Sequence, residues 1–115
     1  MRLNPCDHIP EVRIEPEVMR KLLAYQEGTD GYTVNHISAG CGAKPWPHSH
    51  PHHQVMYILS GSLIFRADDE LLAAKKGDLI QIEPHVVHTW EKIEENAAWI
   101  EFFTPERKDY RPEGE

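Results

Sequence analysis

Four of the eight histidines lie within six residues, in the run Pro-His-Ser-His-Pro-His-His-Gln that ends at Gln54. Imidazole is the commonest metal-binding side chain at neutral pH, and it suits zinc, copper, iron and nickel. Alternate residues of an extended segment project to the same side, so His48 and His50 can direct two rings at one point. Gln54 lies at an even offset from both, and its amide oxygen can join them. The segment therefore predicts three uncharged ligands on one face.

A second pair of histidines, His85 and His88, follows a strand-like run that starts at Gly77. This pair can supply a fourth ligand if the fold brings the two segments together. The remaining histidines of the first group, His52 and His53, are expected to face solvent or to support a neighbouring ligand. The sequence assigns no firm role to His52, His53 or His85.

The first segment resembles the first motif of the cupin superfamily. That motif reads H-x-H, three or four residues, an acidic residue, six residues and a glycine, and this chain has His48, His50, Gln54 and Gly61 at that spacing. Gln54 stands where most cupins have glutamate. The likeness implies that His48, His50 and Gln54 bind a metal ion.

The second segment resembles the second cupin motif, G-x5-P-x-G-x2-H-x3-N. Gly77 and His88 keep its spacing between glycine and histidine, and the resemblance makes His88 the remaining ligand. Glu83, His85 and Lys92 stand in place of the usual proline, glycine and asparagine. These differences leave the ligand positions intact and alter the turn before His88.

Three imidazoles and an amide add no negative charge, so a bound divalent transition metal ion keeps its full charge and acts as a strong Lewis acid. Nickel and zinc are favoured, while iron and manganese are possible. An oxygenase would often use the carboxylate that Gln54 replaces. We therefore expect a reaction that polarises a carbonyl or hydroxyl oxygen.

The last predicted strand places Trp99, Glu101 and Phe103 on one face, and Ile100 and Phe102 on the other. One face must line the barrel. If it is the first, Glu101 enters an aromatic pocket where burial raises its pKa towards values useful for proton transfer. Otherwise Glu101 is a partly exposed residue on an edge strand.

The segment Glu-Phe-Phe-Thr-Pro-Glu-Arg, from Glu101 to Arg107, is similar to one branch of small cupins. This is the pectin-degradation type, which opens 4,5-unsaturated monouronates to linear keto sugars. The likeness implies that Glu101 transfers a proton, Phe103 is a wall against the sugar and Arg107 holds its carboxylate. The branch usually has aspartate at the position of Glu101. On composition alone, Arg107 is an ordinary charged residue of a tail.

The residues before the first motif indicate a short helix. Glu15-Pro16-Glu17 is typical of a helix start, Val18, Leu22 and Tyr25 follow at helical spacing, and Gly28 is a plausible end. This helix would lie on the sheet.

Short apolar runs separated by glycine-rich or charged turns predict an all-β fold. Ser60-Gly61 is typical of a tight hairpin between two of these runs. The cupin resemblance, which covers residues 30–107, implies a jelly-roll β-barrel. We expect one domain, with a lead and short helix at 1–29, the barrel at 30–107 and a tail at 108–115.

The chain has 115 residues, a formal net charge of -7 and a pI near 5.6. This charge disfavours nucleic acid and anionic membranes as partners. We expect neither a membrane span nor a signal peptide, and therefore a cytoplasmic protein. Cys6 and Cys41 are expected to be thiols, and a homodimer is expected because cyclic dimers are the commonest assembly.

Three functions remain open. The leading one is a non-redox, metal-dependent enzyme that acts on a small carboxylated sugar or keto acid, with the unsaturated-uronate ring-opening reaction as the model. The second is a metal-dependent dioxygenase. The third is a cupin that binds or senses a small ligand without turnover.

Overall fold

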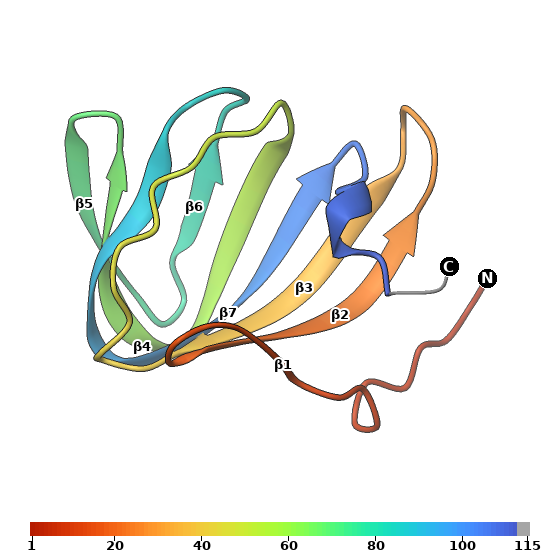
Figure 1. The fold of residues 1–115 in the computed structure, drawn as a ribbon, viewed down its shortest axis with the longest axis horizontal. Coiled ribbons are helices and arrows are strands. Elements are labelled where there is room, and N and C mark those ends of the chain that lie inside the picture. The colour runs from red at the N-terminus through yellow and green to blue at the C-terminus, as the bar shows by residue number, and fades with distance from the viewer. Residues whose placement is uncertain (113–115) are drawn as a thin grey trace.

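Seven β-strands form one antiparallel sheet in the computed structural model, which describes residues 1–112. The sheet order is β1-β2-β3-β7-β4-β5, and β6 pairs with β4. Figure 1 shows the sheet folded over, with β5 and β6 on one side and β2 and β3 on the other. The expected all-β jelly-roll fold is confirmed. The elements are β1 Val12–Glu15, β2 Val18–Gln26, β3 Tyr32–Ala39, β4 His53–Ala67, β5 Glu70–Lys75, β6 Leu79–Ile82, β7 His88–Thr104 and the 3-10 turn η1 Lys108–Tyr110.

Strands β4 and β7 are long, with 15 and 17 residues, and they bend to join both halves of the sheet. The hairpin predicted at Ser60-Gly61 is wrong, because β4 runs through it without a break. Instead, the pairing register with β7 shifts around Ser60 and Ser62, and Gly61 has a φ of 77°. A glycine bulge of this kind bends a strand sharply.

The predicted N-terminal helix is also wrong. Residues 18–26 form β2, which pairs with β1 on one side and β3 on the other. Pro16 and Glu17 make the turn between β1 and β2, and Glu17 adopts a φ of 65°. Backbone pairing along two edges outweighs the modest helical spacing of Val18, Leu22 and Tyr25.

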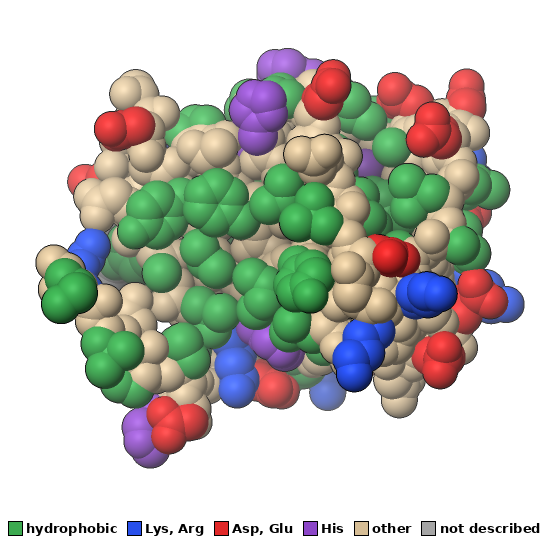
Figure 2. Space-filling model, turned by 180° about the vertical axis from the view of Figure 1, so that it is seen from behind, with side chains coloured by type: hydrophobic (Ala, Val, Ile, Leu, Met, Phe, Trp, Pro, Cys, Tyr) green, Lys and Arg blue, Asp and Glu red, His purple; other side chains and the backbone are tan. Residues whose placement is uncertain are grey.

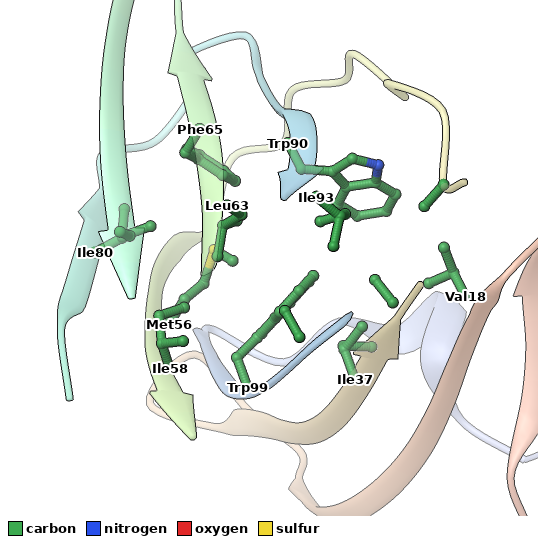
Figure 3. Close-up of a cluster of buried hydrophobic side chains, with 14 of the residues drawn as sticks. Val18, Ile37, Met56, Ile58, Leu63, Phe65, Ile80, Trp90, Ile93 and Trp99 are labelled. Atoms are coloured by element: carbon green, nitrogen blue, oxygen red, sulfur yellow. The ribbon is translucent and has the colours of Figure 1, made fainter. Parts of the chain in front are cut away.

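The hydrophobic core fills the space between the two halves of the folded sheet. Figure 3 shows Leu63 and Phe65 pointing towards Trp99 and Ile37 from the opposite side. These side chains are at most 2% exposed. The core therefore occupies one part of the barrel interior. It holds in place the strands that also carry buried polar residues, such as Gln54 and Glu101.

Residues 108–115 were expected to be a tail. Lys108–Tyr110 forms η1, and positions 113–115 of that expectation lie outside the described residues. Residues 1–112 contain no helix with the length and hydropathy that a bilayer crossing requires.

Candidate metal centre

Three histidine rings converge inside the barrel. One ring nitrogen from each of His48, His50 and His88 lies within 4.8 Å of the others. His50 and His88 are buried, at 7% and 2% exposure, and His48 is partly buried. The structure thus brings together the two segments from which the ligands were predicted.

Each of these rings is oriented by a backbone carbonyl. Nδ1 of His48 donates to the carbonyl of Trp46 at 2.8 Å, and Nδ1 of His88 donates to the carbonyl of Val86 at 2.8 Å. Nδ1 of His50 donates to the carbonyl of His52 at 3.1 Å. A proton held on Nδ1 leaves the lone pair on Nε2, which is the usual way in which proteins orient metal-binding histidines.

The Nε2 atoms of His88 and His50 receive no hydrogen bond from a protein donor when Nδ1 carries the proton. Nε2 of His88 is buried without a hydrogen-bond partner, and Nε2 of His50 faces the amide oxygen of Gln54 at 3.0 Å. With the His50 proton on Nδ1, that contact joins two acceptors, which a cation between them would satisfy. Gln54 is itself 5% exposed. These four side chains therefore fit a divalent transition metal ion, and three imidazoles with one amide are suitable donors for it.

Backbone hydrogen bonds position the ligands. The N–H of His48 donates to the carbonyl of His88 at 3.1 Å, and the N–H of His88 donates to the carbonyl of His48 at 2.9 Å. The N–H of His85 donates to the carbonyl of His50 at 2.8 Å. His85 has a φ of 68°, at the position where the cupin motif has glycine. The loop before β4 is thus fixed to the turn before β7.

Burial favours the uncharged form of the His50 and His88 rings. Loss of hydration lowers the pKa of His88 to about 4, and loss of hydration also lowers the pKa of His50. A neutral imidazole is the form that binds metal ions. The rings of His50 and His88 are therefore in the form that can bind a metal ion at neutral pH.

A cavity of about 30 Å³ lies beside the ligands, with Gln54, Glu101 and Phe103 among the residues in its wall. Trp99, Glu101 and Phe103 all point inwards and are 1%, 7% and 1% exposed, whereas Phe102 is on the outer face. Of the two faces of the last strand, the one that carries Glu101 therefore lines the barrel.

Glu101 is held by two donors. Nδ2 of Asn35 donates to its Oε2 at 3.2 Å, and Nε1 of Trp99 donates to its Oε1 at 3.2 Å. Asn35 is fully buried and lies opposite Glu101 in the β3–β7 register. Burial raises the pKa of Glu101 in spite of these two hydrogen bonds.

Arg107 lies over the aromatic wall of the cavity. Its guanidinium carbon is 4.9 Å from the ring centre of Phe103 and 4.4 Å from that of Tyr110. Two of its nitrogens donate to the carboxylate of Asp109, at 3.1 and 2.8 Å. Its Nη1 is buried without a partner. Arg107 therefore has one donor free for a ligand.

Sequence reasoning gave no role to Asn35 or Tyr110, although both contact the predicted site residues. Asparagine on a strand and a lone tyrosine in a charged tail carry no local signal of this kind. His52, which was left without a firm role, supports the C-terminal segment, because its Nε2 donates to the carbonyl of Glu106 at 3.1 Å. His53 is exposed.

A family model described as Cupin domain matches residues 36–103. Comparison with curated protein sequences gave no match. Among solved structures, KdgF from Halomonas sp. is 25% identical, with 94% of this chain and 98% of that chain covered and a TM-score of 0.83. A cupin-like protein from Thermotoga maritima is 28% identical, with 76% and 68% covered and a TM-score of 0.68. An RmlC-like cupin from Shewanella frigidimarina, 23% identical over 91% of both chains with a TM-score of 0.77, has the same fold.

Proposed function

The chain belongs to the Cupin domain family, and on this premise we propose that it is a metal-dependent, non-redox enzyme that acts on a small carboxylated sugar or keto acid. The model reaction is the ring opening of an unsaturated uronate. The observation that carries the proposal is the position of a buried carboxyl group, Glu101, in the wall of the cavity that the predicted ligands His48, Gln54 and His88 also line. Metal ligands and a proton-transfer group in one cavity are what such a reaction requires.

The proposed ligands are His48, His50, Gln54 and His88, and the proposed ion is nickel or zinc, with iron or manganese as the other possibilities. When bound, the ion supplies a Lewis acid that polarises a substrate oxygen. The side chains hold their nitrogens ready for it, because backbone carbonyls fix all three rings. The unpartnered Nε2 of His88 supports this assignment.

Glu101 is the proposed proton-transfer residue. Burial raises its pKa, so the carboxyl group holds a proton at a higher pH than an exposed glutamate does and can donate it to the substrate. Asn35 and Trp99 fix its two oxygens and thereby the direction of the transfer. Most members of the similar branch have aspartate here, so the longer glutamate moves the carboxyl group by about 1 Å, a distance that matters for the alignment of reacting atoms.

Arg107 and Phe103 are proposed to orient the substrate. The free Nη1 of Arg107 can donate to a substrate carboxylate, while Asp109 holds the other side of the guanidinium. Phe103 forms an apolar wall 4.9 Å from that guanidinium and 5.3 Å from the ring of His50, measured to the ring centres. The likeness to the KdgF structure, at 25% identity, supports the ring opening of an unsaturated uronate as the model reaction.

The test is incubation of the metal-loaded protein with unsaturated galacturonate or mannuronate monomers, with the ultraviolet band of the conjugated enol followed over time. Loss of the band in the presence of protein and metal supports the proposal. Oxygen uptake by the iron-loaded protein would favour a dioxygenase instead. Binding of a small acid without turnover in either assay would favour a sensing role.

A homodimer in the cytoplasm is also part of the proposal. Figure 2 shows hydrophobic side chains gathered across one face of the molecule. Among the exposed apolar residues are Tyr57 and Leu79, which are partners in the β4–β6 pairing, and Phe102, at 48%, 55% and 36% exposure. Exposed apolar patches of this kind are typical of protein contacts. Cys6 and Cys41 are both free, as expected in a reducing compartment. Light scattering after size-exclusion chromatography tests the dimer.

A further inference from the structure

A second hollow lies next to the candidate metal centre. It is a groove of about 1180 Å³ between the N-terminal segment, β2 and the C-terminal segment. The cavity beside the histidines has only about 30 Å³, which is room for about one water molecule and too little for a sugar. A sugar-sized ligand fits the groove, whose volume is slightly above the range of about 300 to 1,000 Å³ that is typical of small-molecule sites.

Tyr110 separates the two hollows. Within residues 1–112 it is the one residue that lines both the groove and the cavity. Its ring packs against Phe103, with 5.7 Å between ring centres. Tyr110 is therefore the shared wall between a ligand in the groove and the residues of the cavity.

Two guanidinium groups contact the Tyr110 ring. The guanidinium carbons of Arg20 and Arg107 each lie 4.4 Å from the ring centre. Arg107 is bonded to Asp109 but keeps one buried donor free. Arg20, on β2, makes no salt bridge with any carboxylate of residues 1–112. Two positive groups with unpaired donors thus lie against the ring that forms the shared wall of the two hollows.

The charge of the groove suits an anion. Three arginines line it: Arg111 is paired with carboxylates, whereas Arg2 and Arg20 form no salt bridge within residues 1–112. The chain as a whole has a net charge of -7, so a locally positive hollow is a departure from the rest of the molecule. Such a field concentrates small anions at the site.

We propose that Arg20 and Arg107 form a carboxylate-binding subsite around Tyr110, at the junction of the groove and the cavity, for a small monocarboxylate such as a uronate. The role of Arg107 rests on the proposed function, and that of Arg20 is new. Arg20 receives the carboxylate in the groove, and the free Nη1 of Arg107 receives it next to the cavity. Planar guanidinium groups are well suited to bind carboxylates by paired hydrogen bonds.

The test uses the full chain loaded with nickel and measures, by titration calorimetry, the affinity for galacturonate and for galactose, which lacks the carboxylate. Arg20→Gln should weaken galacturonate binding by about tenfold to a hundredfold, as expected for loss of a charged hydrogen bond, and leave galactose binding unchanged. Arg20→Lys keeps the charge but not the paired donors, so its affinity for galacturonate should lie between those of the wild type and Arg20→Gln. Arg66→Gln is the control, because Arg66 pairs with Glu91 on another part of the surface.

Three results would overturn the subsite. The first is equal binding of galacturonate and galactose by the wild-type protein. The second is wild-type affinity of Arg20→Gln for galacturonate, and the third is an equal loss for both sugars, which indicates that Arg20 only holds Tyr110 in place. The reaction is tested separately, by turnover of the unsaturated uronates. If galacturonate binding depends on Arg20 but no uronate is turned over, the proposed function is refuted and the subsite stands. If uronates are turned over and Arg20→Gln leaves KM unchanged, the subsite is refuted and the proposed function stands.

Discussion

Addition of Ni²⁺ or Zn²⁺ should raise the melting temperature of the protein, and His88→Leu should remove that rise. His88 is the informative ligand because it is 2% exposed and its Nε2 has no protein partner. An ion that binds only the folded chain stabilises it by mass action, by about 2.7 kcal/mol at a free concentration one hundred times Kd. For a domain of this length, about 1 kcal/mol corresponds to about 4 °C, so the expected rise is about 11 °C.

Without metal, the same substitution should have a small effect. It removes the hydrogen bond from Nδ1 of His88 to the carbonyl of Val86, which contributes about 1 kcal/mol. It also removes the buried Nε2, which costs about 1 to 3 kcal/mol while it lacks a partner. The two changes oppose each other, so the melting temperature of the metal-free variant should stay within about 4 °C of the wild type.

The assay is thermal unfolding of the wild type, His88→Leu and a control, His53→Leu, each with and without added metal. His53 is exposed and is not among the three converging histidines, so its variant should keep the full rise. A wild type that shows no rise at saturating nickel, zinc, iron or manganese, or a His88→Leu variant that keeps the rise, would refute the ligand assignment. A rise lost equally in both variants would indicate binding at surface histidines.

Other predictions concern Glu101 and two glycines. Glu101→Gln should retain stoichiometric metal in elemental analysis and lose turnover, and an unchanged rate would make Glu101 a structural residue. Burial raises the pKa of Glu101, so between pH 4.5 and this raised pKa the folded chain binds more protons than the unfolded chain. The free energy of unfolding should therefore fall as the pH rises from 4.5 to the raised pKa. Urea denaturation at several pH values should show this fall in the wild type and less of it in Glu101→Gln. Gly61→Ala should destabilise the protein by at least about 2 kcal/mol, since φ is 77° and a Cβ would overlap the carbonyl of Asn96. Gly77→Ala should cost less in the same urea assay, since its φ is 93° but nothing lies near its Cβ, and equal losses would contradict this account.

Local spacing in the sequence predicted His48, His50 and Gln54 as candidate ligands, whereas His88 was added through the resemblance to the second cupin motif. His48 and His50 are two residues apart, and the structure directs both rings at His88. The face on which Glu101 lies could not be chosen from the sequence. It depends on the pairing of β7 with β3 and β4, which puts Asn35 opposite Glu101 and is decided by contacts far apart in the chain.

The two errors in the strand assignment have the same origin. Residues 18–26 contain apolar positions that satisfy a helical spacing, but strands on both sides provide backbone hydrogen bonds for an extended chain. Ser60-Gly61 has the composition of a hairpin, but the long partner strand β7 continues past it, and the glycine makes a bulge. Tyr110 was missed because its environment includes Arg20, which is distant in sequence.

The reciprocal hydrogen bonds between His48 and His88 have a consequence for the order of folding and metal binding. They join the two segments that carry the candidate ligands through main-chain groups alone, so we expect the metal-free chain to keep these segments together and to bind the proposed ion after folding. Exchange of the proposed ion would then not require the protein to unfold. Under that order of events, the metal supply of the cell would have a large part in deciding which ion the proposed site holds.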